Sequence, residues 1–241
     1  MGKFSRVAVA ALLLLTVSTV AQAKMSKFHK RLREATFALY INVPSGDEAT
    51  DVPSSDYHFE CTATAFERTV EGYKLITAGH CVSPAPDGKY FVTEDILDKE
   101  DFLPVTVEKF VRNLPVADFA ILDLKTTHKY AIVSISKKEL PAVESRVVNV
   151  NFTEGIGKLT SIGHISVGVL RSTAGSDGEC NLCGGNFMVQ LFAGPGASGS
   201  AIVDEKTHRI IGILVGGTTS TTGAFCEPMS KYRLFLTLKQ G

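Results

Sequence analysis

One segment of the sequence could present a nucleophile: the small-residue run GPGASGSA at 194–201, with Ser198 at its centre. A nucleophilic serine needs a tight loop that exposes its Oγ and backbone N–H groups that face the developing oxyanion. The glycines permit such a loop, and we expect the N–H groups of Gly196 and Ser198 to be the two donors. The alternative is an ordinary turn of small residues between two strands.

A general base for this serine is present in TAGHC at 77–81, where His80 follows an apolar run. Histidine commonly takes this role because its pKa lies near working pH. The small residues at 78 and 79 let other chain segments approach closely. A histidine at a strand end is by itself more often structural, but the other five histidines of the chain lack comparable surroundings.

The third candidate is Asp118, which opens the apolar run DFAILDL at 118–124. An ionised carboxylate in such a run is costly to bury unless it is paired or hydrogen-bonded. Placed beside the N–H of His80, it would gain a partner and fix the tautomer of the imidazole. A carboxylate that caps the end of a strand is the competing interpretation.

Many short runs of β-branched and aromatic residues, separated by turn signals, must position these side chains. They lie at 35–43, 59–67, 73–81, 89–92, 104–111, 118–124 and 130–135, and then at 146–152, 159–170, 186–192, 200–204, 209–217 and 232–238. This pattern predicts an all-β sandwich or barrel, and the length that remains after residue 23 suits two packed barrels. We place a first barrel with His80 and Asp118 at 35–128 and a second with Ser198 at 129–241.

Residues 1–23 have the features of an export signal. Lys3 and Arg6 precede an uncharged, mostly apolar run, and AQA at 21–23 supplies the small residues that a signal peptidase needs. The run is short for a membrane span of roughly 20 residues, so no stable membrane partner is expected; an uncleaved N-terminal anchor is the alternative. The body of the protein is predicted to be secreted or periplasmic, after a basic lead-in at 24–34.

Charge and cysteine usage limit the expected partners and cofactors. The chain has 25 basic and 25 acidic side chains, and because phosphate binding needs a net basic face, nucleic acid is not expected as a partner. Five cysteines in an oxidising compartment favour disulfides, with at least one thiol left over. Cys180 and Cys183 form a C-x-x-C, but zinc would need two further ligands nearby. A local disulfide, or a bond from this loop to Cys226, is therefore favoured, and no metal is expected.

The three segments closely resemble those of the trypsin-like serine proteases of the chymotrypsin fold: TAGHC their histidine motif, DFAILDL their aspartate motif and GASGSAIV their serine motif. The order histidine, aspartate, serine also belongs to this arrangement, whereas subtilisins and α/β-hydrolases use other orders. The resemblance covers about 36–238 and implies two perpendicular, packed, six-stranded antiparallel β-barrels with the active site between them. The stretch 195–203 looks more like the bacterial HtrA-type or glutamyl-endopeptidase-like branches than like digestive trypsins.

The resemblance also implies roles for particular residues. It implies a catalytic triad of His80, Asp118 and Ser198, with Gly196 contributing to the oxyanion hole. A disulfide between Cys61 and Cys81 would lie beside the histidine.

Substrate contacts are expected on either side of the nucleophile. Val215, Gly216 and Gly217 resemble the edge strand that pairs with the substrate backbone, and Phe192 and Ala193 are expected to line part of the primary pocket. No acidic residue stands where a trypsin binds Arg or Lys, so we expect an uncharged pocket that accepts apolar or medium-sized side chains.

Two positions depart from the family pattern. Ala197 stands where zymogen-activated trypsins carry an aspartate that pairs with the newly freed N-terminus, so that activation switch is not expected here. Val215 replaces a serine commonly found behind the triad, which leaves open what forms the outer hydrogen bonds of Asp118.

The predicted function is hydrolysis of peptide bonds through an acyl-enzyme on Ser198, by a secreted serine endopeptidase that acts on protein or peptide substrates. This chemistry needs no cofactor or metal. The alternative is a catalytically inactive binding protein on the same fold, since a fold alone does not establish chemistry.

Overall fold

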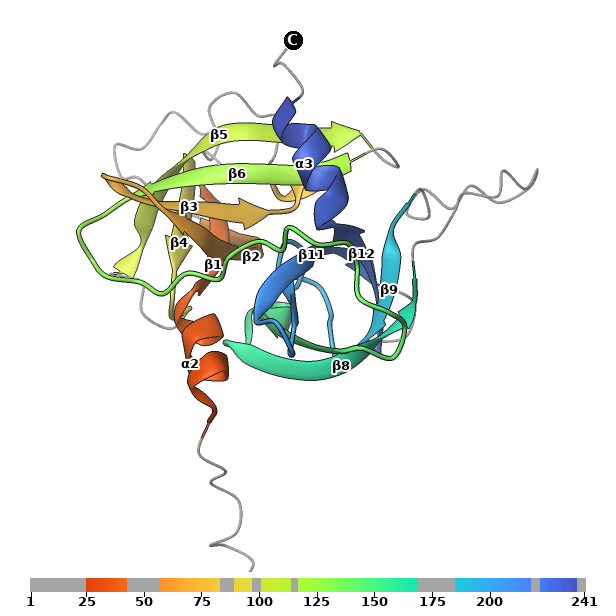
Figure 1. The fold of residues 1–241 in the computed structure, drawn as a ribbon. Coiled ribbons are helices and arrows are strands. Elements are labelled where there is room, and N and C mark those ends of the chain that lie inside the picture. The colour runs from red at the N-terminus through yellow and green to blue at the C-terminus, as the bar shows by residue number, and fades with distance from the viewer. Residues whose placement is uncertain are drawn as a thin grey trace, which may run out of the picture.

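Two barrels make up most of the computed structural model (Figure 1). The model describes residues 25–42, 57–82, 89–96, 101–113, 117–168, 185–217 and 222–237. Each barrel is closed, antiparallel and six-stranded, which confirms the predicted fold class. The predicted export signal at 1–23 and the cysteines Cys180 and Cys183 lie outside the described residues.

The first barrel has the strand order β1-β2-β3-β6-β5-β4, closed by the pairing of β1 with β4. Its strands are β1 (Thr36–Asn42), β2 (Tyr57–Arg68), β3 (Gly72–Thr77), β4 (Lys89–Thr93), β5 (Leu103–Asn113) and β6 (Ala117–Lys125). Along β1, Phe37 and Leu39 belong to the main core, while Ala38 and Tyr40 pack with Phe152 of the other barrel. Both faces of this strand are therefore buried, and its sequence reads as a continuous apolar run.

The second barrel has the order β10-β11-β12-β9-β8-β7, closed by the pairing of β10 with β7. Its strands are β7 (Arg146–Asn151), β8 (Leu159–Val167), β9 (Phe187–Gln190), β10 (Ala201–Asp204), β11 (Arg209–Gly217) and β12 (Gly223–Pro228). In β7, Val147 packs inside the second barrel, whereas Val148 and Val150 join the core that continues into the first barrel. Because successive side chains of β7 point to opposite faces, this strand packs in the cores of both barrels.

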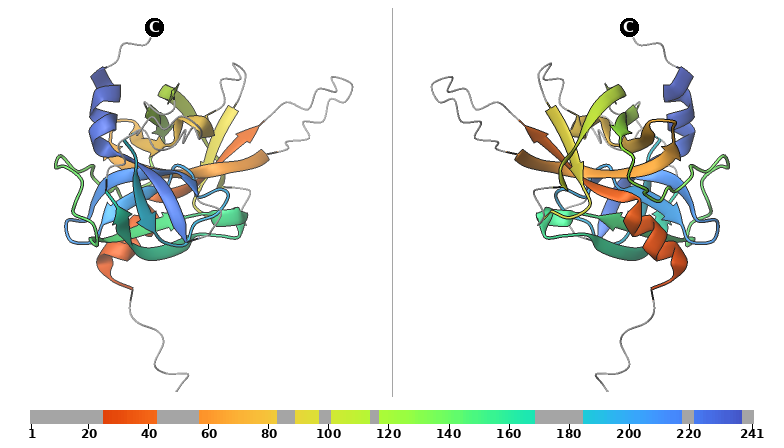
Figure 2. Two further views of the ribbon diagram at one scale, coloured as in Figure 1. Left: turned by 90° about the vertical axis from the view of Figure 1, so that its right-hand side faces the viewer. Right: turned by 90° about the vertical axis from the view of Figure 1, so that its left-hand side faces the viewer.

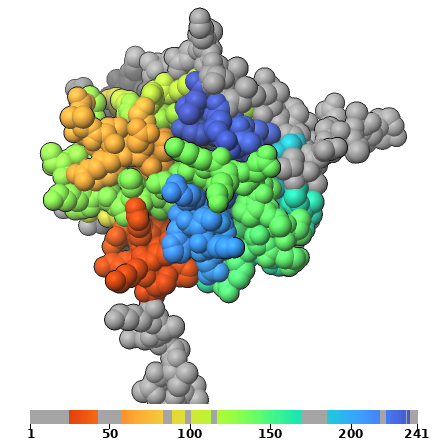
Figure 3. All heavy atoms as spheres, in the orientation of Figure 1, coloured from red at the N-terminus to blue at the C-terminus, as the bar shows by residue number. Residues whose placement is uncertain are grey.

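The linker 126–145 crosses between the barrels on the face shown in Figure 3. The run at 130–135 was predicted as a strand, and this is wrong, because its backbone groups bond to both barrels in turn. The N–H of Val133 donates to Ala65 in β2, and the N–H of Ser136 donates to Ile210 in β11. The boundary predicted at 128/129 falls within this linker.

Among the described residues, the two α-helices flank the barrels on the same side of the molecule (Figure 2). Helix α2 (Lys27–Glu34) lies in the basic lead-in, capped by Ser26, whose side chain accepts from the N–H of His29. Helix α3 (Met229–Thr237) occupies most of a run that was predicted as a strand, so that prediction is wrong. No helix among the described residues is long and apolar enough to cross a membrane.

Candidate active site

His80 and Asp118 are joined by two hydrogen bonds. Asp118, fully buried at the start of β6, places Oδ2 2.6 Å from Nδ1 of His80. Its Oδ1 accepts from the main-chain N–H of His80 at 2.7 Å. His80 itself lies in the 3₁₀ turn η1 (Gly79–Cys81), and its side chain is 27% exposed. The carboxylate therefore fixes both the backbone and the ring of His80, and leaves Nε2 to act on other groups.

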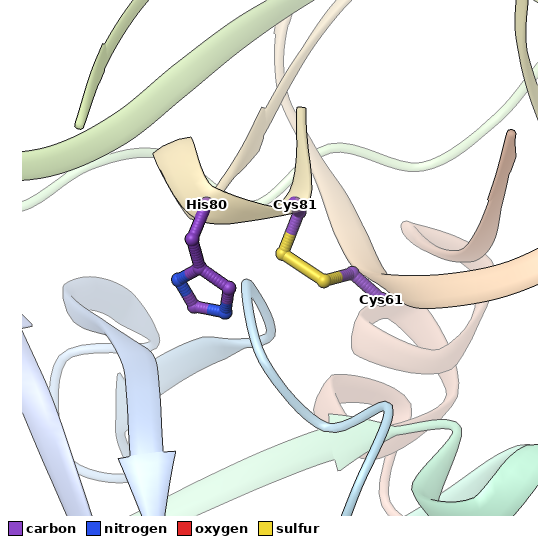
Figure 4. A group of neighbouring side chains, drawn as sticks. All are labelled: Cys61, His80 and Cys81. Atoms are coloured by element: carbon purple, nitrogen blue, oxygen red, sulfur yellow. A yellow bond between two sulfur atoms is a disulfide. The ribbon is translucent and has the colours of Figure 1, made fainter. Parts of the chain in front are cut away.

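A disulfide between Cys61 and Cys81 braces this turn (Figure 4). It joins β2 to η1 directly beside His80, which confirms the predicted bond. In Figure 4 the ring of His80 points toward the blue segments of the second barrel.

Ser198 lies in the tight loop that precedes β10, and its side chain is half-buried. Gly196 and Gly199 have φ values of 85° and 82°, in the left-handed region that favours glycine. A Cβ atom on Gly199 would lie 2.9 Å from the main-chain nitrogen of Ala78. The residue after the nucleophile therefore packs directly on the segment that leads into His80.

Thr62 fastens the same loop to the first barrel. Its main-chain N–H donates to the carbonyl of Ser198 at 2.8 Å, and its hydroxyl donates to the carbonyl of Gly196 at 2.8 Å. Thr62 is fully buried and follows Cys61 in β2. The loop of Ser198 and the turn of His80 are thus both joined to strand β2, the loop by hydrogen bonds and the turn by the disulfide.

The loop leaves two N–H groups free to bind an oxyanion. Intramolecular acceptors take the N–H groups of Gly194, Ala197, Gly199 and Ser200. Within the described ranges, no acceptor takes the N–H of Gly196 or Ser198. The carbonyl of Pro195 accepts from the N–H of Glu154 at 2.6 Å. Because the carbonyl and N–H of a trans peptide point in opposite directions, the N–H of Gly196 points away from Glu154.

The residues predicted to bind substrate lie on both sides of β12. Gly217 in β11 pairs with Ala224, and Gly223 pairs with Gln190, shortly before Phe192. Phe192 is 48% exposed and Ala193 is buried. That these residues bind substrate stays a prediction.

Strand β11 also offers a backbone edge. On its β10 side, hydrogen bonding runs as far as Leu214, which bonds to Gly199 and Ser200. Beyond Leu214, in the part of the chain that the structure describes, Val215 and the two glycines after it pair with no strand on that side. This arrangement fits the predicted role of β11 in binding an extended peptide.

A second buried carboxyl, absent from the sequence predictions, lies behind Asp118. Glu227 is fully buried, and its Oε1 accepts from Nζ of Lys231 at 3.1 Å. Burial raises the pKa of Glu227 to about 7, although the ammonium of Lys231 and the main-chain N–H of Asp118 both oppose the rise. Nothing in the sequence indicated this ion pair, because Glu227 lies in strand β12 and Lys231 in helix α3.

The side chains around the histidine do not suit a metal ion in this form of the protein. A ring nitrogen of His80 and the sulfurs of Cys61 and Cys81 lie within 4.8 Å of one another. Both sulfurs are bonded to each other, so neither is available as a thiolate ligand.

Comparison with solved structures agrees with the fold. A mutant of Rv3671c from M. tuberculosis H37Rv, in its inactive form, superposes with a TM-score of 0.63 at 12% identity, over 90% of this chain and 94% of that one. The active form of the Rv3671c protease gives a TM-score of 0.63 at 13% identity, over 89% and 86% of the two chains. At such identities the likeness shows the fold alone.

Comparison of this sequence with those of known proteins and families identifies its family. No curated protein sequence matches the chain. The model of the trypsin-like peptidase domain matches residues 61–213, a segment that contains His80, Asp118 and Ser198. Because the matched segment spans more than half of the 241 residues, the chain belongs to the trypsin-like peptidase family, as a serine endopeptidase.

Proposed function

We propose that the protein is exported and hydrolyses peptide bonds through an acyl-enzyme on Ser198. One arrangement carries the proposal. The imidazole of His80 is held by the buried carboxylate of Asp118, and the loop of Ser198 is hydrogen-bonded through Thr62 to β2, the strand that the disulfide joins to the turn of His80. A base, its orienting group and a nucleophile on a tight loop are what acyl transfer requires.

The proposed reaction begins when Oγ of Ser198 attacks the carbonyl carbon of the substrate and Nε2 of His80 takes its proton. The negative oxygen of the tetrahedral intermediate accepts hydrogen bonds from the N–H groups of Gly196 and Ser198. When the C–N bond breaks, His80 returns the proton to the leaving amine. A water molecule, deprotonated by His80, then attacks the acyl-enzyme and releases the carboxylic acid, and Ser198 regains its proton.

Substrate would bind as an extended strand on the free edge of β11 at Val215, Gly216 and Gly217. Phe192 and Ala193 would line an uncharged primary pocket, which favours apolar or medium-sized side chains. Cleavage-site profiling on a peptide library tests this preference, and a strict requirement for a charged side chain would contradict it. That the chain belongs to an HtrA-type or glutamyl-endopeptidase-like branch stays a prediction.

Export is supported by the basic and apolar N-terminal residues and by the disulfide, since disulfides persist in oxidising compartments. We propose cleavage after Ala23. N-terminal sequencing of protein recovered from the medium or the periplasm should begin at Lys24, and an intact N-terminus on membrane-bound protein would favour the anchor instead.

Labelling with a fluorophosphonate tests the proposed nucleophile. The parent protein should be labelled, and Ser198→Ala should abolish labelling and lower hydrolysis by about 10⁶-fold. Ser134→Ala, at an exposed serine of the linker, is the matched control and should label like the parent. A folded parent that takes no label would favour the non-catalytic alternative.

A further inference from the structure

Two asparagines occupy interior positions of the second barrel. Val147, Asn149 and Asn151 lie on one face of β7, and Val147 packs in the apolar core of this barrel. Asn149 and Asn151 are both fully buried. Burying an amide without hydrogen bonds costs free energy, whereas burying an apolar residue does not. The hydrogen bonds of these two side chains therefore indicate their role in the structure.

Asn149 holds the end of the nucleophile loop. Its Nδ2 donates to the hydroxyl of Ser200 at 2.8 Å and to the carbonyl of Ala201 at 2.9 Å. Its Oδ1 accepts from Nδ2 of Asn151 at 2.6 Å. Both N–H groups of this amide are therefore hydrogen-bonded, and these two bonds fix the chain just after the nucleophile.

Asn151 holds the start of the same loop through Thr153, in the 3₁₀ turn η3 (Thr153–Gly155). Its Oδ1 accepts from the main-chain N–H and the hydroxyl of Thr153, at 3.0 and 2.8 Å. Because that hydroxyl donates to Asn151, it presents a lone pair to the N–H of Gly194, 3.1 Å away. The next residue of η3, Glu154, donates to the carbonyl of Pro195.

The two carbonyls that flank the N–H of Gly196 are thus both held. Pro195 accepts from the N–H of Glu154, and the carbonyl of Gly196 accepts from the hydroxyl of Thr62. The loop has no polar side chain before the nucleophile with which to hold itself, because Ala197 is apolar and packs in the core. Glycine-rich loops have many accessible conformations, so an external restraint must select one.

We infer that Thr62, Asn149, Asn151, Thr153 and Ser200 form a buried loop-holding network that keeps the N–H of Gly196 directed at the oxyanion. These are positioning residues, which act through the loop and do not touch substrate. The inference rests on the proposed function. Preorganised donors are effective because they need not reorient when charge develops.

Thr153 offers the sharpest test, because valine has nearly its shape and serine keeps its hydroxyl. We would measure the rate constant for fluorophosphonate labelling against pH for the parent, Thr153→Val and Thr153→Ser. Thr153→Val should lower the plateau rate by roughly 10- to 100-fold, somewhat less than the loss of an oxyanion donor itself. The pH midpoint should not move, since the His80–Asp118 pair is untouched. Thr153→Ser should regain most of the plateau.

Thr36→Val is the matched control. The hydroxyl of Thr36 is equally buried and donates to the carbonyl of Leu32 at 2.7 Å, away from the loop. This variant should label at the parental plateau. Urea unfolding of each variant establishes that the labelled protein is folded.

Several outcomes would overturn the inference. A folded Thr153→Val that labels at the parental plateau would do so, as would a shift of the pH midpoint without loss of plateau. If Thr153→Val does not fold, Ser200→Ala tests the other end of the loop and should also lower the plateau; a parental rate would reject the network. Failure of the parent to label would instead count against the proposed function, so the two failures are distinguishable.

Discussion

The main-chain N–H of Thr62 donates to the carbonyl of Ser198 across the boundary between the barrels, at 2.8 Å. Thr62 follows Cys61, and the disulfide joins Cys61 to Cys81, the neighbour of His80. The proposed base and nucleophile, which come from different barrels, are therefore linked through one covalent bond and one hydrogen bond. Their relative position depends on β2 as much as on their own segments.

Removal of the disulfide should weaken both stability and activity. The bond closes a loop with a sequence separation of 20 residues, so Cys61→Ala combined with Cys81→Ala should lower the free energy of unfolding by about 3 kcal/mol. Fluorophosphonate labelling should slow because the His80 turn loses its brace. Treatment with dithiothreitol is the control: it should slow labelling of the parent and leave the double variant unchanged. Equal unfolding midpoints for parent and double variant would contradict the prediction.

Asp118→Asn should preserve the fold and nearly abolish catalysis. The amide has the size of the carboxylate, but it favours the wrong tautomer of His80 and cannot stabilise the imidazolium. Hydrolysis should fall by about 10⁴-fold. Asp123→Asn, further along β6, is the control and should leave the rate within about twofold of the parent. A folded Asp118→Asn protein with near-parental hydrolysis would remove Asp118 from the proposed triad.

The two barrels and the segments that contain the proposed site residues could be predicted, because short stretches of the sequence indicate both. Strands such as β7 and β11 show runs of β-branched residues, and the segments around His80 and Ser198 are short and distinctive. Helix α3 was missed because the run at 232–238 is short and consists mostly of β-type residues, although the buried residues Met229, Tyr232 and Phe235 follow a helical spacing. In such short apolar runs, periodicity alone does not separate strand from helix.

The loop-holding network could not be predicted from the sequence. Asn149 meets Ser200 across 51 positions, and Thr153 meets Gly194 across 41, so no spacing relates them. The only local sign is the pair of amides within the valine-rich strand β7. Likewise, the ion pair of Glu227 is local, but its place near Asp118 results from the packing of the second barrel against the first.

Glu227 should make stability fall with rising pH. Its pKa is raised by burial from 4.5 to about 7, so the folded protein binds the proton more tightly than the unfolded chain. The resulting stabilisation is complete below about pH 4.5 and is lost as pH rises through about 7. Glu227→Gln should remove this loss, which we expect to be on the order of 1–3 kcal/mol. Urea unfolding between pH 4.5 and 7.5 measures the difference.

Two comparisons isolate this effect. Glu139→Gln, at an exposed glutamate of the linker, should keep the parental pH dependence. Lys158 affects stability in a different pH range, because burial lowers its pKa from 10.5 to about 8. Its contribution to the free energy of unfolding therefore rises with pH only above about 8. Parallel pH profiles for the parent and Glu227→Gln below pH 7.5 would show that Glu227 does not titrate in this way.

Gly196→Ala should impair labelling far more than it impairs folding. A Cβ atom there would lie 2.9 Å from the carbonyl oxygen of Phe152 and would overlap the ring of Phe59, so the peptide that carries the proposed oxyanion donor must move. We expect labelling to fall by about 10²-fold or more, as for loss of the donor itself. Gly157→Ala is the matched control, because Gly157 also has a positive φ (122°) but has no atom within 4 Å of the added Cβ. Gly157→Ala should lose some stability and keep the parental labelling rate. If both variants instead labelled equally slowly, backbone strain, and not displacement of the donor, would explain the effect.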